Sequence, residues 1–543
     1  MSQDMEKIES SSTSGDVESS PVPYTGPQSG EANYERELDR EEEYQLERLV
    51  SGSRESHVSH KGIKLRMGGS KPIPPMVPKT DYIVEFDGPE DPLHPKNRTL
   101  REKLTACIFL GLTTCTVSWG SAIFATAIPA VAQEFHVGQV VATLGISLYI
   151  AGFAAGPILW GSLSELVGRK GPILVSQFGF VLFSFATATA KDFQTVMLCR
   201  FFAGFIGSAP LAVIGGAYTD MFSHQARGKS MVGYLSMVFV GPTIAPVVGG
   251  FISASYLGWR WTEYITGIMG SFVLVMDYFF YEESYYPIVL VKKAKRLREQ
   301  TGNWAIHAVA EQKNLDLNRI LQNSILRPLH YLTTQPIVFL IAIYISFVYG
   351  ILYLCLEVYP LIFMGGYGFT GGKAELPYLG ILVGMFIGGA YLLTFEPRYG
   401  RKVDQNGGRP CPDARLDAML LPAVCFPIGL FWLTWTGNCP QHIHWIVPTL
   451  AGLFIGFALM GIFLSAICYM VESYLPVVAS VMAANAFLRA AFASSFPLFA
   501  KAMFNNMGIN WAGTLLGCLA TIMVPIPFVF RIYAPALKKT IKF

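Results

Sequence analysis

The chain has 543 residues, of which 52% are hydrophobic and only 15% charged, and its formal net charge is +3 at pH 7. A soluble domain carries about 25% charged residues, so this composition excludes an ordinary soluble protein and favours one embedded in a lipid bilayer. The lack of a basic face argues against a nucleic-acid partner, and nine cysteines without a C-x-x-C pair predict neither a disulfide framework nor a metal site.

Residues 1–100 are rich in Ser, Glu, Pro and Gly and poor in apolar side chains, which predicts a cytoplasmic, largely disordered N-terminal tail. Apolar runs follow, each long enough to cross a bilayer as a helix of about 20 residues. We place them at 104–130, 139–163, 172–190, 194–219, 230–255, 262–281, 337–362, 376–396, 417–436, 444–470, 476–500 and 509–533. The fold class expected is therefore an all-α integral membrane protein with twelve transmembrane helices.

The loops between these runs differ in charge on the two sides of the membrane. On one side a loop carries at most one basic residue, namely Lys191, Arg260, Lys373 or Lys501. The loops on the other side carry more, including eight basic residues in the segment 282–330. Because short basic loops stay in the cytoplasm, this asymmetry predicts a multi-pass protein with both termini cytoplasmic.

The long segment 282–330 divides the spans into two sets of six. The tripeptide "GRK" stands after the second span at 168–170 and after the eighth at 400–402, the equivalent place in each set. Internal repeats of this kind are typical of secondary transporters. We predict an N-terminal six-helix half at 101–281, a cytoplasmic central loop at 282–330, and a C-terminal six-helix half at 331–543 that ends in a short cytoplasmic tail.

Several motifs occur in an order that resembles a known family. They are "GSLSELVGRKGP" (161–172), "LCRFFAGFIGSAPLAVIGGAYTD" (198–220), "GPTIAPVVGG" (241–250) and "SVMAANAFLRAAFASSFPLF" (480–499). The chain resembles the major facilitator superfamily, and within it the fungal twelve-span drug:proton antiporters, which include multidrug and polyamine exporters. The resemblance implies the major facilitator fold, a small-molecule substrate, a proton gradient as the energy source without a cofactor, and a monomer in the plasma membrane.

The loop after the second span has a mechanical interpretation. Gly161 and Gly168 permit close approach and a tight turn, and Glu165 can face Arg169 one helical turn away. The resemblance implies that this loop, with Lys170, is a gating loop that latches the two halves in the outward-open state. The alternative is ordinary positive-inside topology, with Arg169 and Lys170 at lipid headgroups.

The fifth span contains the segment that resembles the family's antiporter motif. Its small or bent positions are Gly241, Pro242, Pro246, Gly249 and Gly250. Small residues allow close backbone contact between membrane helices, and prolines bend them. The resemblance implies an exporter, which counts against a nutrient importer, whereas plain helix packing would need the same residues.

Ionisable residues inside the spans are candidates for proton coupling. Arg489 lies near the middle of the eleventh span, while Arg200 lies nearer the outer end of the fourth and could snorkel to the interface. The resemblance associates Arg200 with proton coupling, but arginine keeps its proton and can only bias a carboxylate partner. The better proton carriers are Glu263 and Glu357.

Two further acids, Asp220 and Glu472, stand at the inner ends of spans four and ten. We expect them to be helix-end or loop partners at the membrane interface rather than proton carriers.

An aromatic stripe supplies the candidates for substrate binding. Tyr349 and Tyr353 share a helix face one turn apart, and Glu357 continues it. Such a surface would accept flat apolar or cationic compounds through stacking and cation–π contact, although aromatic stripes are also common in cores and at lipid. Trp119 and Asn485, the latter one turn before Arg489, complete the candidate set.

The function expected is proton-coupled efflux of drug-like compounds or secondary metabolites across the plasma membrane. No Walker loop or nucleophile elbow is present, so we do not expect an enzyme. One alternative is a polyamine (spermine or spermidine) exporter, which Glu263 and Glu357 would favour. Another is a non-transporting membrane sensor built on a transporter scaffold. The sequence does not name the substrate.

Overall fold

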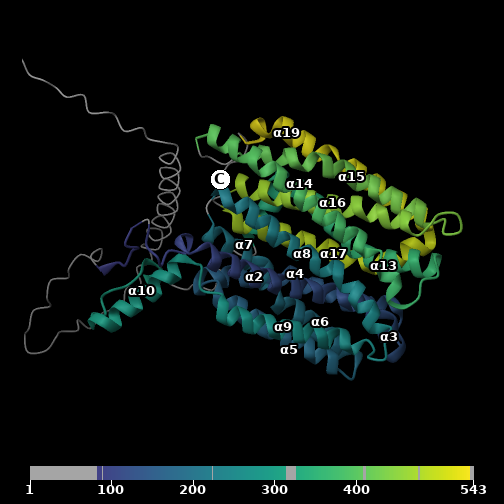
Figure 1. The fold of residues 1–543 in the computed structure, drawn as a ribbon, viewed down its shortest axis with the longest axis horizontal. Coiled ribbons are helices and arrows are strands. Elements are labelled where there is room, and N and C mark those ends of the chain that lie inside the picture. Colours follow the sequence, from purple (N-terminus) through teal and green to yellow (C-terminus); the bar gives the residue numbers. More distant parts are fainter. Residues whose placement is uncertain are drawn as a thin grey trace, which may run out of the picture. The chain divides into compact units, whose positions relative to one another are not determined.

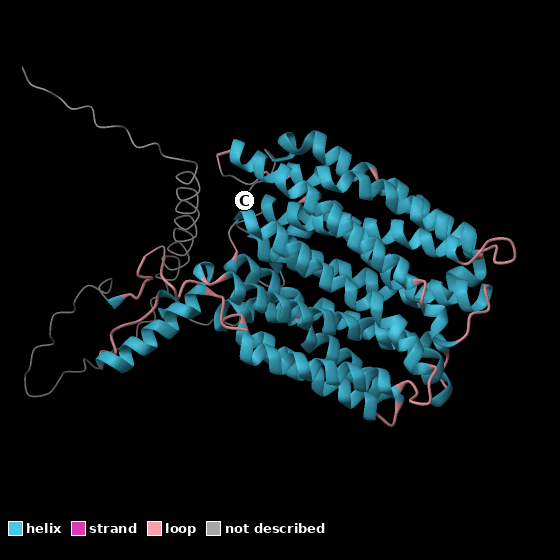
Figure 2. Ribbon diagram, viewed as in Figure 1, coloured by secondary structure: helices cyan, strands magenta, loops and turns pink. Residues whose placement is uncertain are grey.

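The computed structural model describes residues 82–538 apart from 89, 223, 313–325, 408–410 and 475–476, so most of the predicted tail lies outside the described residues. The chain divides into two compact units, residues 62–403 with 410–543 and residues 1–61 with 404–409, and the transmembrane helices belong to the first. In the part of the chain that is described, the regular structure is helical apart from one isolated β-bridge between Ile83 and His307 (Figure 2).

The helices follow the order of the predicted spans. Those before the central loop are η2 (Pro95–Asn97), α2 (Leu100–Ile123), η3 (Phe124–Ala127), α3 (Ile128–Glu134), α4 (Gln139–Val167), α5 (Lys170–Thr189), α6 (Phe193–Gly207), α7 (Ala209–Met221), α8 (His224–Ser253) and α9 (Arg260–Phe280). The central region contains α10 (Tyr286–Thr301), η4 (Val309–Gln312) and α12 (Arg327–Thr334). The remaining helices are α13 (Pro336–Pro360), η6 (Leu361–Gly366), η7 (Gly371–Glu375), α14 (Tyr378–Gln405), α15 (Asp413–Gly437), α16 (Ile446–Ser473), α17 (Val478–Met507), α18 (Ile509–Met523) and α19 (Pro525–Lys538).

The twelve predicted spans are all helical. In the described part of the chain, eleven helical stretches are long and apolar enough to cross a membrane, the first running through α2, η3 and α3 and the fourth through α6 and α7. The twelfth is α9, a helix of 21 residues that includes Arg260, Glu263 and Asp277 and packs against α2 and α5. A helix satisfies its own backbone hydrogen bonds, which hydrocarbon cannot do. The prediction of a twelve-helix membrane fold is confirmed.

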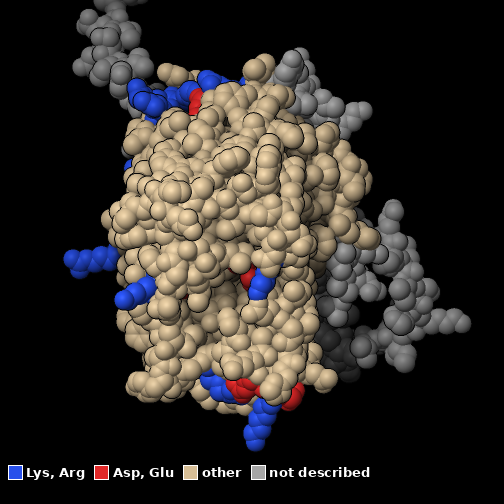
Figure 3. Space-filling view, turned by 90° about the vertical axis from the view of Figure 1, so that its right-hand side faces the viewer, with Lys and Arg blue, Asp and Glu red and all other residues tan. Residues whose placement is uncertain are grey.

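The spans lie side by side along one direction (Figure 1). We call the end of the bundle where Arg169 and Arg415 lie the basic end, and the end where α3 and η7 lie the opposite end. Seen from the opposite end, Lys, Arg, Asp and Glu occupy only a few places on the surface (Figure 3). Large apolar side chains are exposed around the outer helices, for example Ile522 (73%) and Phe279 (70%). A surface of this kind fits contact with lipid chains.

A small layer forms where residues 82–98 meet α10. Val84, Ala294 and Ala308 make a separate apolar cluster, which Leu290 and Leu297 of α10 join. Lys293 binds Asp91 at 3.3 Å, and the Asp91 carboxylate also accepts hydrogen bonds from backbone amides. The apolar face of the basic helix α10 is therefore covered by protein.

Candidate functional site

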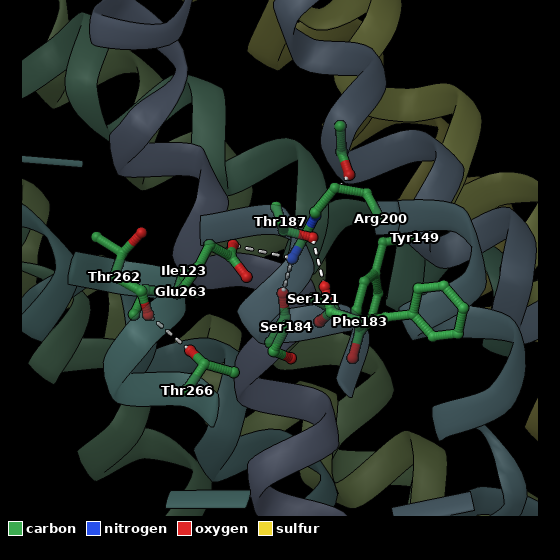
Figure 4. Close-up of polar contacts among 12 residues, drawn as sticks. Ser121, Ile123, Tyr149, Phe183, Ser184, Thr187, Arg200, Thr262, Glu263 and Thr266 are labelled. Carbon is green, nitrogen blue, oxygen red and sulfur yellow. Dashed lines mark hydrogen bonds and ion pairs between the residues drawn. The ribbon is translucent and has the colours of Figure 1, made fainter. Parts of the chain in front are cut away.

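The first half of the bundle contains a fully buried ion pair. Arg200 of α6 and Glu263 of α9 are each 1% exposed, and Nη1 of Arg200 lies 3.1 Å from Oε1 of Glu263 (Figure 4). The same guanidinium donates to the backbone carbonyls of Gly145 at 3.1 Å and Gly120 at 2.8 Å. The expectation that Arg200 could snorkel is wrong, because it joins α2, α4, α6 and α9 inside the half.

Aromatic rings complete this environment. The guanidinium carbon of Arg200 lies 4.4 Å from the ring centre of Tyr149 and 4.8 Å from that of Phe124. Cation–π contacts of this kind stabilise a desolvated charge. Trp119 belongs to the same half, since its Nε1 donates to the Thr266 hydroxyl of α9 at 3.1 Å. Its role as a substrate contact stays a prediction.

A second cluster lies in the middle of the bundle and is shared by both halves. The rings of Tyr349 and Tyr353 on α13 are 5.2 Å apart, and Tyr349 also contacts Phe239 of α8 at 6.1 Å and Phe463 of α16 at 6.0 Å. The hydroxyl of Tyr353 shares hydrogen bonds with Ser121 of α2 at 2.7 Å and with Tyr349 at 3.2 Å. This central cluster therefore links α2 and α8 to α13 and α16.

Arg489 of α17 completes the central cluster. Its guanidinium carbon lies 4.9 Å from the ring centre of Tyr349 and 5.2 Å from that of Phe463. Asn485, one turn away on α17, is 1% exposed, and its Oδ1 has no hydrogen-bond partner among the described residues. The structure thus brings Tyr349 and Tyr353 together with Arg489, which the sequence placed among the proton-coupling candidates. The roles of all three stay predictions.

Glu357 lies further toward the opposite end of α13. It contacts Thr143 of α4 and lies within electrostatic range of Lys501. It also interacts with Glu375, a 6% exposed carboxylate of η7. Glu357 therefore belongs with Lys501 and Glu375 to a group of charges near the opposite end of the bundle.

The glycines of α8 allow three close contacts. A Cβ atom on Gly241 would lie 2.5 Å from the carbonyl oxygen of Cys115 and 2.7 Å from the amide nitrogen of Trp119, both in the backbone of α2. A Cβ on Gly249 would lie 2.6 Å from the Thr126 hydroxyl, and one on Gly250 would lie 2.7 Å from Cγ of Glu375. Pro242 and Pro246 lie inside the same helix. The motif at 241–250 thus has one face against α2 and another face against η7 of the other half.

At the basic end, the 168–170 loop binds Asp220 of its own half and Glu283 at the start of the central segment. Gly168 has φ +99°, and a Cβ there would meet the Glu283 carboxylate, which accepts hydrogen bonds from the amides of Arg169 (2.8 Å) and Lys170 (3.1 Å). The Arg169 side chain pairs with Asp220 at 3.2 Å. Both observations explain the tight turn, and Asp220 is a helix-end partner as predicted.

Two expectations about this loop need correction or stay open. A Cβ on Gly161 would have no neighbour within 4 Å. The prediction that Gly161 permits close approach of another segment is therefore wrong. Glu165 is exposed and adds to the negative potential at Arg169. The latch between the halves stays a prediction.

The second half has its own arginine cluster, but it is centred on Arg415 of α15. Arg415 binds Glu396 of α14 at 2.5 Å and Glu472 of α16 at 2.9 Å, and it stacks on Tyr399. Among the described residues, Arg401 of the repeated "GRK" makes one hydrogen bond, to the carbonyl of Pro397 at 3.4 Å. The counterpart of Arg169 is therefore Arg415, because both arginines stand at the start of a span and hold an acid at the end of another.

Known proteins resemble this chain over most of its length. A model of the Major Facilitator Superfamily matches residues 110–497. The chain belongs to the major facilitator superfamily. The proton:xylose symporter XylE bound to 6-bromo-6-deoxy-D-glucose has the same fold, with a TM-score of 0.54, 15% identity, and coverage of 79% of this chain and 95% of that one.

The relatives with high identity are fungal. The chain is 51% identical over 479 residues to the multidrug transporter TPO1_2 of Candida glabrata, covering 88% of this chain and 82% of the relative. It is 48% identical over 479 residues to the major facilitator superfamily multidrug transporter FLU1 of Candida albicans, covering 88% and 78%. These matches confirm the resemblance to the fungal drug-transporter group within the superfamily.

Several residues of these clusters were not predicted from the sequence, among them Ser121, Phe463 and Glu375. Ser121 and Phe463 lie in apolar runs where nothing distinguishes them from core residues. Glu375 follows Lys373 in a short segment that resembles an exposed loop, although the helix η7 buries it. The "GG" at 371–372 could have indicated that this segment is packed closely against a helix. A Cβ on Gly372 would meet the ring of Phe251 of α8.

Proposed function

We propose that this superfamily member exports drug-like organic molecules in exchange for protons by alternating access. The observation that carries the proposal is the central cluster, in which Ser121 and Phe239 of one half meet Tyr349, Tyr353 and Arg489 of the other. Polar and charged groups at the middle of a membrane bundle mark substrate paths. A cluster divided between two halves is opened when one half rocks against the other.

The proton carrier we propose is Glu357. Glu263 is already paired with Arg200 in a fully buried contact, so it is better suited to hold four helices together. Glu357 lies between α13 and α4, and its Oε1 has no hydrogen-bond partner among the described residues. A carboxylate at a contact that opens and closes can change between a dry and a hydrated state, and its proton affinity changes with it.

The orientation that fits this function places the basic end in the cytoplasm of a plasma-membrane protein, with both termini inside. The loops that carry Arg169, Lys170, Arg398 and Arg415 then follow the positive-inside rule. The 168–170 loop would act as a gate held by Asp220 of its own half and by Glu283 of the central segment. Glu375, which lies against Gly250, would close the opposite end.

Polyamine export is the second candidate. The observation that favours it is the pair of acids Glu357 and Glu375 near the opposite end, because carboxylates attract polycationic substrates.

Transport by purified protein in liposomes tests the proposal. We expect an imposed pH gradient to drive uphill movement of at least one aromatic probe, tested with naphthalene-2-sulfonate as the anion and rhodamine 6G as the cation. Glu357→Gln should abolish this accumulation while downhill exchange of the same probe continues. Arg398→Gln is the matched control, since Arg398 is exposed and stacks only on Phe395. Accumulation by Glu357→Gln at the wild-type level would assign the proton to another group. No flux of naphthalene-2-sulfonate, rhodamine 6G, azoles or spermidine in wild-type liposomes would contradict the transport proposal.

A further inference from the structure

The geometry points to a central cluster that selects aromatic organic anions, bound at Arg489, rather than aromatic cations or polyamines. This inference rests on the proposed transport function and names the substrate class of that same cluster.

The first step is that the aromatic faces are already occupied. The sequence alone suggested that the Tyr349 stripe would accept flat apolar or cationic compounds. In the structure, the Arg489 guanidinium lies over both the Tyr349 and Phe463 rings. A substrate cation would compete with this fixed charge for the same rings and would be repelled by it at short range.

The second step is the missing counter-charge. None of the ion pairs among the described residues involves Arg489, whereas Arg169, Arg200 and Arg415 each bind a carboxylate. A guanidinium inside a membrane bundle is costly without a negative partner. A carboxylate or sulfonate of a substrate would supply that partner, and the planar guanidinium can bind it through two hydrogen bonds.

The third step is that the acids lie elsewhere. Glu263 is neutralised by Arg200. Glu357 follows Tyr349 by eight residues, which is about 12 Å along a helix, and its neighbours are Thr143, Lys501 and Glu375. Glu357 is one helical turn from Tyr353, but among the described residues no hydrogen bond or ion pair joins a carboxylate to Tyr349, Tyr353 or Arg489.

The surrounding groups fit the rest of such a substrate. Phe239 and Phe463 pack edge-to-face with ring centres 4.7 Å apart, so an aromatic ring system finds apolar edges and faces. The hydroxyls of Ser121 and Tyr353 and the buried side chain of Asn485 add hydrogen-bonding groups. A proton that enters and a monovalent anion that leaves together carry two positive charges inward, so the membrane potential would accelerate this exchange. Exchange of one proton for one monovalent cation is electroneutral.

Two permanently charged probes on the same ring system test the inference. These are naphthalene-2-sulfonate and (2-naphthylmethyl)trimethylammonium, which share a naphthalene ring and cannot be neutralised by protonation. Transport by the full chain in liposomes is measured under an imposed pH gradient, with and without a potassium-diffusion potential. We expect the sulfonate to have at least a tenfold lower KM than the ammonium probe, and the potential to accelerate only the sulfonate.

The variants separate charge from fold. Arg489→Gln should raise the KM of the sulfonate at least tenfold, Arg489→Lys should raise it less, and Arg398→Gln should leave it unchanged. A preference for the ammonium probe or for spermidine, or a sulfonate KM that is the same in Arg489→Gln, would overturn the anion assignment while transport itself stands. If naphthalene probes, rhodamine 6G and spermidine all fail to move in wild-type liposomes, the proposed function fails instead. If Arg489→Gln is not monodisperse, the comparison of Arg489→Lys with wild type decides, and an unchanged sulfonate KM there would overturn the inference.

Discussion

Replacement of Glu263 by Gln tests the buried ion pair. The substitution keeps the size of the side chain and an oxygen that can accept from Arg200, but it removes the negative charge. The Arg200 charge then remains 1% exposed in the middle of four helices with neutral partners alone, namely the Gln oxygen, the carbonyls of Gly120 and Gly145 and two aromatic rings. We expect Glu263→Gln to lower the free energy of unfolding strongly.

The size of the loss follows from the geometry. The N–O distance is 3.1 Å, which puts the charge centres about 4 Å apart and gives about 4 kcal/mol at an effective dielectric constant of about 20. Measured losses for one partner of a buried pair are about 3–5 kcal/mol. Removing both charges in the double variant Arg200→Met with Glu263→Met should restore most of this loss, because no charge is then left unpaired.

Unfolding of the purified protein in mixed detergent and sodium dodecyl sulfate micelles measures these differences. The control is Glu134→Gln, which weakens the pair with Arg260 at 2.7 Å whose side chains are 32% and 40% exposed. It should cost at most about 1 kcal/mol. A loss for Glu263→Gln as small as that of the control would refute the claim that the pair holds the first half together.

Three further predictions concern other parts of the chain. Gly241→Ala should impair transport and lower the free energy of unfolding by about 1–3 kcal/mol, because its Cβ would meet the α2 backbone at 2.5 Å. The control is Gly233→Ala in the same helix, where a Cβ has no neighbour within 4 Å, and its flux should match that of wild type. Arg415→Gln should cost about 3–5 kcal/mol in micelle unfolding by leaving Glu396 and Glu472 without their cation, whereas an equal loss for Arg401→Gln would show that the repeated tripeptide is the true counterpart. The backbone amide of Asp87 donates to Asp91 and holds the pKa of its carboxyl below the usual value, against desolvation and with help from Leu93 and Lys293. A lowered carboxyl pKa stabilises the fold above the unfolded pKa, and this stabilisation is lost as pH falls through the folded value. Asp91→Asn should therefore speed amide exchange in α10 roughly tenfold at pH 7 and much less below about pH 4, and a difference that does not shrink in acid would contradict this.

The fold was predictable because hydrocarbon leaves few choices to an apolar chain. A run of about 20 apolar residues must become a helix to satisfy its backbone. The predicted sixth span at 262–281 therefore nearly coincides with Arg260–Phe280, although Glu263 and Asp277 lie within it. Helix ends were harder, since α3 extends the first span to Glu134, past the predicted end at 130.

The candidate site was predictable only in part. Tyr349, Tyr353 and Glu357 could be grouped because four-residue spacing places them on one helix face. The partner of Arg200 could not be identified, because Glu263 is 63 positions away and meets it only after α6 and α9 pack. The repeated "GRK" pointed to Arg401, whereas the acids of the second half are held by Arg415, which helix packing alone decides.

The most direct test of the central claim measures the coupling of substrate to protons. Inside-out vesicles with an acidic lumen and purified full-length protein should accumulate naphthalene-2-sulfonate. Rhodamine 6G is the second probe and covers the case of a cationic preference. We expect the concentration of the transported probe in the lumen to rise above its external concentration, and nigericin with potassium to abolish this rise. Glu357→Gln should exchange the probe without accumulating it. Accumulation that persists after the pH gradient has collapsed would contradict proton-coupled export by this protein.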